Sequence, residues 1–195
     1  MALCFAEQTK WIKSIENNSL YYIGSLDWQP NTEALMWFVV DVLPLIKRRV
    51  PTVTFHVAGK NADKAFERFL LRHHVVFHGE VANAEDFLSK YHISVVPLKA
   101  GSGLRIKILE AMKNHKPVVA TDKAIQGLPA ISGTHFMAAN TASEFADAVV
   151  QLIHNEEYAR SIANNAYNFA FQNFSSKILA GQLHDFLIHL ATPKK

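Results

Sequence analysis

The feature that most constrains this chain is an alternation of short β-branched or aromatic runs with longer helical patterns between residues 20 and 140. Such an alternation is typical of βαβ units and predicts an α/β fold with a parallel sheet. The helical segments repeat apolar residues every three or four positions. About six strands are expected, doubly wound, at residues 20–24, 52–58, 75–78, 93–97, 117–120 and 135–138, with helices at 32–49, 62–72, 84–90, 104–114 and 143–154.

The part of the chain after residue 155 has a different pattern, without a further strand. Residues 156–171 and 176–190 are expected to form two closing C-terminal helices. A chain of 195 residues can bury a core of its own, so one domain is expected at residues 20–195. Residues 1–19 are interpreted as an approach segment or an interdomain linker.

Composition excludes several classes of function. The 20 basic and 17 acidic residues leave a charge of only +3, which argues against nucleic acid as a partner. The single cysteine, Cys4, excludes an intramolecular disulfide and a Cys-x-x-Cys zinc site, and the histidines show no metal-ligand spacing. The apolar runs fall short of the ~20 residues that a membrane span needs, and the start has no signal-peptide pattern. A cytoplasmic chain without a metal is expected, and association with a membrane surface stays open.

The segment VVPLKAGSGLRIKILEAMKNHKPVVAT, residues 95–121, carries the strongest indication of chemistry. Gly101 and Gly103 allow a tight turn, and a helix that starts near Leu104 would present unpaired N–H groups to an anion. Lys107 adds positive charge nearby, and Glu110 follows one turn later. The spacing predicts a phosphate site, although an ordinary solvated pair of Lys107 and Glu110 explains the same spacing.

This segment resembles the C-terminal domain of glycosyltransferase family 4, in which G-x-G-x-R-x-K-x-L-E-A-M precedes a P-V-V-A-T strand. The opening IGSLDWQPNTEALMWFVVDVLPLIKRRVP, residues 23–51, and the segments VTFHVAGKNA, VVFHGEV and SEFADAVVQLI also follow the order of that family. The resemblance covers roughly residues 20–190. It implies a Rossmann-like three-layer domain that forms one half of a GT-B fold, with the acceptor domain absent from this chain.

The resemblance assigns roles to individual residues. Glu110 matches the second glutamate of the paired-glutamate motif of the family, which typically holds the donor ribose. The first glutamate would fall eight residues earlier, at Ser102, which cannot supply a carboxylate. Ser25 and Pro30 stand in the first loop, where many members carry arginine and lysine. Lys107, with Arg105 as a weaker candidate, therefore becomes the expected source of positive charge for the diphosphate.

The remaining candidate residues belong to the loops after the strands. The turn His78-Gly79-Glu80-Val81 stands where the family holds the nucleobase, although a plain glycine turn explains it too. The interpretation is that Glu110 and Lys107 serve catalysis. The expected substrate-binding residues are Ser25, Lys60, Asn61, Gly79, Val81, Gly101, Ser102, Gly103, Leu104 and Arg105. A groove at the strand carboxyl ends is expected to be lined by Ser25, Lys60, Val81, Gly103, Lys107 and Glu110.

The implied function is transfer of a hexose from a UDP- or GDP-sugar to a glycan or lipid-linked acceptor in cell-surface polysaccharide assembly, with retention at the anomeric carbon. The expected partner domain is an N-terminal acceptor domain of the same polypeptide, and this chain alone should bind donor and transfer nothing. Two alternatives stay open. One is half of a nucleotide-sugar epimerase, and the other is a non-catalytic nucleotide-binding module.

Overall fold

The computed structural model describes residues 18–101 and 106–191. Its strands are β1 (Ser19–Ile23), β2 (Thr54–Ala58), β3 (Val76–Phe77), β4 (Ile93–Val96), β5 (Val118–Ala120) and β6 (Met137–Ala138). The helices are α1 (Gln29–Trp37), a π-helical segment η1 (Phe38–Val42), α2 (Leu43–Arg49), α3 (Lys64–Arg72), α4 (Ala84–Lys90), α5 (Ile106–Lys113), α6 (Asp122–Ile125), α7 (Ala142–His154), α8 (Glu156–Phe174) and α9 (Ser176–Ala191).

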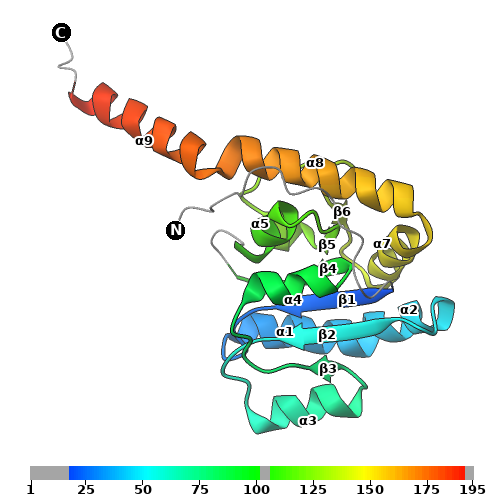
Figure 1. The fold of residues 1–195 in the computed structure, drawn as a ribbon. Coiled ribbons are helices and arrows are strands. Elements are labelled where there is room, and N and C mark those ends of the chain that lie inside the picture. Colours follow the sequence, from blue (N-terminus) through cyan, green and yellow to red (C-terminus); the bar gives the residue numbers. More distant parts are fainter. Residues whose placement is uncertain (1–17, 102–105, 192–195) are drawn as a thin grey trace.

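The six strands form one parallel sheet in the order β3-β2-β1-β4-β5-β6 (Figure 1). Every strand pairing in it is parallel, as expected from the βαβ alternation. Strands β2 and β3 follow β1 toward one edge of the sheet, and β4, β5 and β6 follow on the other side of β1 toward the opposite edge. This confirms the predicted α/β, Rossmann-like fold, and it makes β1 and β4 the point where the strand order reverses.

Helices cover both faces of the sheet, which gives the predicted three layers. Successive side chains of a strand point to opposite faces, so each strand serves two cores. In β1, Leu20 and Tyr22 face the core shared with α1, α2, α3 and α7, whereas Tyr21 packs against α4. A third cluster joins α5 and α8 to β4 and β5. Helix α8 reaches two of the cores, through Ile162 and Ala166.

The prediction of a single α-helix over residues 32–49 is wrong in two respects: the helix starts earlier, and its middle is a π-helical segment. The structure has α1, η1 and α2 end to end, and the N–H of Leu43 donates to the carbonyl of Phe38, five residues earlier. Pro44 explains the π segment, because proline has no N–H and its ring clashes with the carbonyl four residues before it. The helix starts at Gln29 because Pro30 fits a first turn, where its missing N–H is not needed.

Capping explains two smaller differences. The helix predicted from residue 62 begins at Lys64, because the Asp63 carboxylate accepts a hydrogen bond of 2.7 Å from the N–H of Phe66. The unpredicted short helix α6 begins after Thr121, whose hydroxyl accepts a hydrogen bond from the N–H of Ala124 at 3.0 Å.

A buried lysine fastens β5 to α4 at the end of the sheet where the strands begin. Lys116 is 5% exposed, and its ammonium donates to the carbonyls of Tyr91 at 2.7 Å and Ser89 at 3.2 Å. These carbonyls lie at the C-terminus of α4, where carbonyl groups have no N–H donor within the helix. Burial of the ammonium lowers the pKa of Lys116 to about 8. The lysine therefore serves structure at the end of the sheet opposite the strand carboxyl ends.

The last helix, α9, leaves the body of the domain. It continues from α8 and projects beyond the sheet on the side to which the strands point (Figure 1). Among the helices of the described ranges, none combines the length and the apolarity needed to cross a membrane.

Candidate functional site

The carboxyl ends of β1 and β4 define the candidate site, because ligands of open parallel sheets bind where the strand order reverses. After β1 the chain enters the loop that starts at Gly24, and after β4 it enters the loop that leads to Gly101 and α5. Gly101 has a φ of +105°, a left-handed conformation that suits glycine. Ser102, Gly103, Leu104 and Arg105 lie outside the described residues, so their predicted roles stay predictions.

Lys107 of α5 reaches across this reversal point to β1 and the first loop. Its ammonium donates to the hydroxyl of Tyr22 at 2.5 Å and to the side-chain oxygen of Asn31 at 3.0 Å. It also lies 4.2 Å from the centre of the Tyr22 ring, a cation–π distance. Tyr22 and Asn31 are 1% and 3% exposed, so two buried residues hold the lysine. The ammonium of Lys107 therefore lies beside Gly24, at the start of the first loop.

Two glycines let the loops come this close together. A methyl group on Gly24 would lie 2.8 Å from the ammonium of Lys107, and one on Gly59 would lie 2.0 Å from the carbonyl oxygen of Gly24. Backbone hydrogen bonds hold both glycines in place, from Gly24 to Ala58 at 3.1 Å and from Gly59 to Gly79 at 2.8 Å. The loops after β1, β2 and β3 are thus joined by backbone contacts.

Glu110 is half-buried on α5, one turn beyond Lys107. Burial raises the pKa of the Glu110 carboxyl, and the negative charge of Glu85 raises it further, whereas Lys113 and Lys107 lower it. Lys113 is itself ion-paired with Glu85 at 2.5 Å. Glu110 is therefore a partly desolvated acceptor between two lysines of the same helix.

The turn after β3 also lies at this edge of the sheet. Gly79 has a φ of +66°, which explains the glycine, and a methyl group there would meet nothing within 4 Å. Val81 is half-buried and packs against a cluster of Tyr21, Ala58, Phe87, Leu88 and Tyr91. The apolar surface around Val81 is thus partly filled by aromatic side chains of the protein itself.

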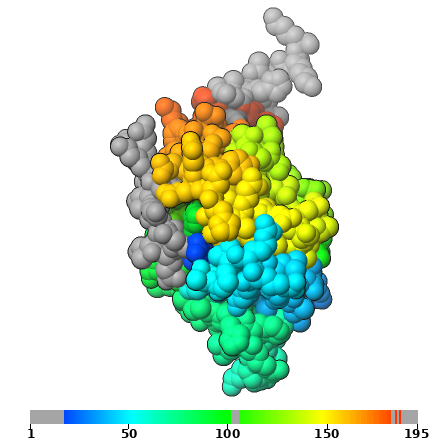
Figure 2. Space-filling view, turned by 90° about the vertical axis from the view of Figure 1, so that its right-hand side faces the viewer, coloured from blue at the N-terminus to red at the C-terminus, as the bar shows by residue number. Residues whose placement is uncertain are grey.

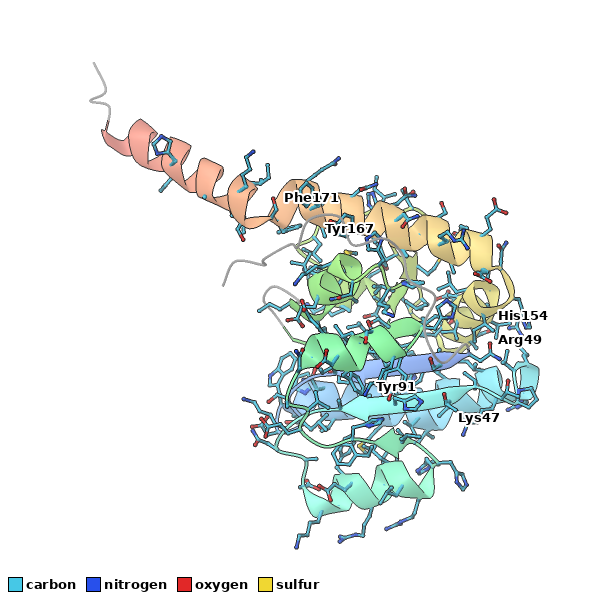
Figure 3. The ribbon with its side chains drawn as sticks, in the orientation of Figure 1. Lys47, Arg49, Tyr91, His154, Tyr167 and Phe171 are labelled. Atoms are coloured by element: carbon cyan, nitrogen blue, oxygen red, sulfur yellow. The ribbon has the colours of Figure 1, made fainter. Side chains whose placement is uncertain are left out.

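A histidine pair lies beneath this turn. His56 Nδ1 and His78 Nε2 are 3.1 Å apart, and the hydroxyl of Tyr91 is 3.3 Å from the same His78 nitrogen. The ring of Tyr91 stacks on His56 with centroids 4.0 Å apart. Tyr91 lies between α4 and the strands (Figure 3). The pair links β2 to the turn through polar contacts that strand patterns in the sequence do not reveal.

The side chains of two further predicted residues, Ser25 and Asn61, both bind Asp27. Asn61 donates to Asp27 at 2.9 Å, and the hydroxyl of Ser25 donates to the other oxygen of Asp27 at 2.8 Å. Hydrogen bonds from Ser25 and Asn61 lower the pKa of Asp27. Asp27 and Asn61 line a hollow of about 510 Å³ between the first loop, α1 and α3, and neither Lys107 nor Glu110 is among its lining residues. Lys60 is exposed beside Asn61, and its carbonyl accepts a hydrogen bond from Leu26 at 2.9 Å.

Sequence reasoning missed the two residues that hold Lys107, Tyr22 and Asn31. Asn31 lies in the first turn of α1, within the Trp-x-Pro-Asn segment, and it also donates to the carbonyl of Ser25 at 2.7 Å. An asparagine directly after a proline at a helix start was a signal that could have been used. The pattern around Tyr22 is that of an ordinary buried strand, and no neighbouring residue in the sequence indicates a contact with Lys107.

The strand order defines the fold of this protein: its six-stranded parallel sheet matches the Rossmann-like domains of GT-B glycosyltransferases. The chain belongs to the family described as glycosyl transferases group 1, whose model matches residues 17–155. Glycosyl transfer is the activity for which this family is named.

Three proteins are similar to this chain, and the chain spans less than half the length of two of them. A relative from Klebsiella pneumoniae, an uncharacterized 44.6 kDa protein in the cps region, is 26% identical over 172 residues, which are 84% of this chain and 44% of the relative. The structure of Anabaena Alr3699/HepE in complex with UDP and glucose is similar with a TM-score of 0.72 and 20% identity, over 88% of this chain and 48% of that one. The C-terminal domain of the glycosyl transferase group 1 family protein LpcC from Francisella tularensis has a TM-score of 0.62 and 17% identity, over 81% of this chain and 86% of that one.

Proposed function

We propose that this chain is the donor-binding half of a retaining family 4 glycosyltransferase, a hexosyltransferase that uses a UDP- or GDP-sugar. The observation that carries the proposal is the ammonium of Lys107, held by Tyr22 and Asn31 at the point where the strand order reverses. A nucleoside diphosphate needs positive charge at such a point, most of all when it leaves the sugar and its own charge grows. In the proposal a lysine supplies this charge and no metal ion is needed.

The other contacts follow from the order of the groups in a nucleotide sugar. Glu110 accepts hydrogen bonds from the ribose hydroxyls, and Gly79 and Val81 contact the nucleobase. The sugar contacts backbone amides of Gly101 to Leu104 and side-chain hydroxyls, which take the place of the missing first glutamate. Lys60 approaches from the loop after β2. For Ser25 and Asn61 we propose a supporting role, because both side chains bind Asp27.

The complete protein, in this proposal, transfers a hexose to a glycan or lipid-linked acceptor in cell-surface polysaccharide biosynthesis, on the cytoplasmic side of the membrane. Two comparisons support it: the Anabaena structure contains UDP and glucose, and the Klebsiella relative is named for the cps region. This chain covers 44% of that relative, so an N-terminal acceptor domain in the same polypeptide would complete the cleft. The chain alone would bind donor weakly and transfer nothing.

Replacing Glu110 with glutamine tests the ribose contact. The amide keeps the shape but is a weaker acceptor than a carboxylate, so the affinity for uridine or guanosine and for their diphosphates should fall roughly five- to tenfold. Protonation of Glu110 should also weaken nucleoside binding, because a neutral carboxyl is a weaker acceptor. Since burial raises the pKa of Glu110, the wild-type protein should lose nucleoside affinity at a higher pH than a protein with an ordinary glutamate in this place. The Glu110→Gln protein should not show this loss, and calorimetric titration at several pH values measures both effects.

A 2′,3′-dideoxynucleoside diphosphate is the matched control for this substitution. Without ribose hydroxyls, it should bind the wild-type and Glu110→Gln proteins almost equally. If the substitution weakens the dideoxy compound as much as the natural one, Glu110 does not contact the ribose and the assignment is wrong.

A further inference from the structure

One face of α3 is basic and apolar and has no acidic residue. In an α-helix, positions four apart lie on the same side, so Lys64, Arg68 and Arg72 form one exposed row. The opposite side buries Phe66 and Leu70 in the core. The side chains that α3 leaves exposed are those of Lys64, Ala65, Arg68, Leu71 and Arg72, which we call the basic face of α3.

The charges of this face are not used in ion pairs within the part of the chain that the structure describes. There, the ion pairs join Arg49 with Asp147, Lys113 with Glu85 and Arg160 with Glu156, and none includes a residue of α3. Two acidic residues, Asp63 and Glu67, lie close to the face. Asp63 caps the helix through Phe66, and Glu67 is half-buried at the margin of the face.

Apolar surface is exposed among these charges. Leu71 is 61% exposed next to the row of basic side chains, and Val76 of the adjoining strand β3 is 43% exposed. Strand β3 is the outer strand of the sheet and pairs with β2. The face therefore combines exposed positive charge with a large apolar side chain that folding has not buried.

The position of α3 leaves the candidate site open. Helix α3 lies beside the outer strand β3, whereas α5, which carries Lys107, packs on β4 and β5 (Figure 1). The segment of α3 and β3 forms the lower tip of the molecule in the space-filling view (Figure 2). Helices α8 and α9 lie at the opposite end. A flat partner could therefore cover the basic face without covering the strand carboxyl ends.

We propose that the basic face of α3 binds the surface of a membrane that contains anionic lipids. Lysine and arginine bind lipid phosphates there while their stems lie along apolar surface, and Leu71 enters the boundary of the acyl chains. A soluble polyanion would use the charges but would gain nothing from an exposed leucine. This inference goes beyond donor binding and deepens the proposed function, because a lipid-linked acceptor is presented at such a surface.

Vesicle co-sedimentation of the 195-residue chain tests the inference, with phosphatidylcholine vesicles that either contain or lack phosphatidylglycerol. Each basic residue near an anionic surface contributes about a fivefold change in partitioning, so Arg68→Gln with Arg72→Gln should weaken binding to anionic vesicles roughly thirtyfold. Added salt should weaken wild-type binding as well. Leu71→Ala should reduce partitioning by an amount that salt does not change.

The matched control removes two charges at the other end of the molecule, Arg160→Gln with Lys177→Gln. This protein has the same net charge as the test protein and should bind anionic vesicles like the wild type. The inference is overturned if the wild-type chain ignores anionic vesicles, if the control pair loses as much binding, or if the chain binds RNA or heparin but not vesicles. Titration of the Arg68→Gln, Arg72→Gln protein with a nucleoside diphosphate should show unchanged affinity. Vesicle binding and nucleotide binding are therefore tested separately, and a failure of one proposal can be told from a failure of the other.

Discussion

Replacing Lys107 with methionine should weaken the binding of a nucleoside diphosphate about ten- to a hundredfold and leave nucleoside binding nearly unchanged. Methionine keeps an apolar stem of similar length but removes the ammonium. A charge-assisted hydrogen bond contributes roughly 1.5–3 kcal/mol, which is the origin of the expected factor. Because the uncharged nucleoside has no group for the ammonium to neutralise, the two ligands separate charge recognition from general binding. Isothermal titration calorimetry with both ligands measures the difference.

Lys90→Met on α4 is the control for the loss of one lysine. Lys90 is exposed at the C-terminus of α4, at the end of the sheet opposite the strand carboxyl ends, so its replacement should change neither affinity. Loss of Lys107 also removes a donor from Tyr22 and Asn31, and a thermal melt should establish that the protein stays folded. Equal weakening of nucleoside and diphosphate in a folded Lys107→Met protein would mean that the lysine has only a structural role.

Gly59→Ala should destabilise the domain severely. The added carbon would lie 2.0 Å from the carbonyl oxygen of Gly24 and 2.8 Å from Leu26 Cγ. Neither segment is free to move, because the backbone of Gly59 bonds to Gly79 and that of Gly24 bonds to Ala58. Overpacking against backbone should cost about 3–5 kcal/mol. In a chain of this size that corresponds to a fall in Tm of roughly 6–20 °C, which a thermal melt measures.

The same substitution at Gly181 provides the control. This glycine lies within α9, and a methyl group there would meet nothing within 4 Å. Alanine is the better helix former by about 0.5–1 kcal/mol, so Gly181→Ala should leave stability unchanged or raise it slightly. If Gly59→Ala melts at the wild-type temperature, the close approach of the first two loops does not exist.

Much of the fold could be predicted because the alternation of patterns has a direct physical cause. A parallel sheet requires a crossover between its strands, and most crossovers in this sheet contain a helix that the period of its apolar residues reveals. The detail within residues 29–49 could not be predicted in the same way. A periodic apolar pattern does not show how a helix accommodates Pro44, and the π segment that precedes the proline keeps α1 and α2 end to end.

The candidate site was predictable only where its residues are close in sequence. Lys107 and Glu110 share one helix, so the spacing of the motif was enough to suggest them. Tyr22 and Asn31 bond to Lys107 from 85 and 76 residues away, and only the adjacency of β1 and β4 brings the three together. The bond from Asn61 to Asp27, beside the hollow, likewise joins two loops distant in sequence, and the ligand contact expected of Asn61 stays a prediction.

Titration of the wild-type chain with UDP, GDP, ADP and CDP tests the central claim most directly. We predict saturable binding of UDP or GDP, weak because the proposed acceptor domain is not part of this chain, and a clear loss of that binding in the Lys107→Met protein. Absence of binding by all four diphosphates to a folded chain, or binding that does not change when Lys107 is replaced, would contradict a donor site at the junction of β1 and β4.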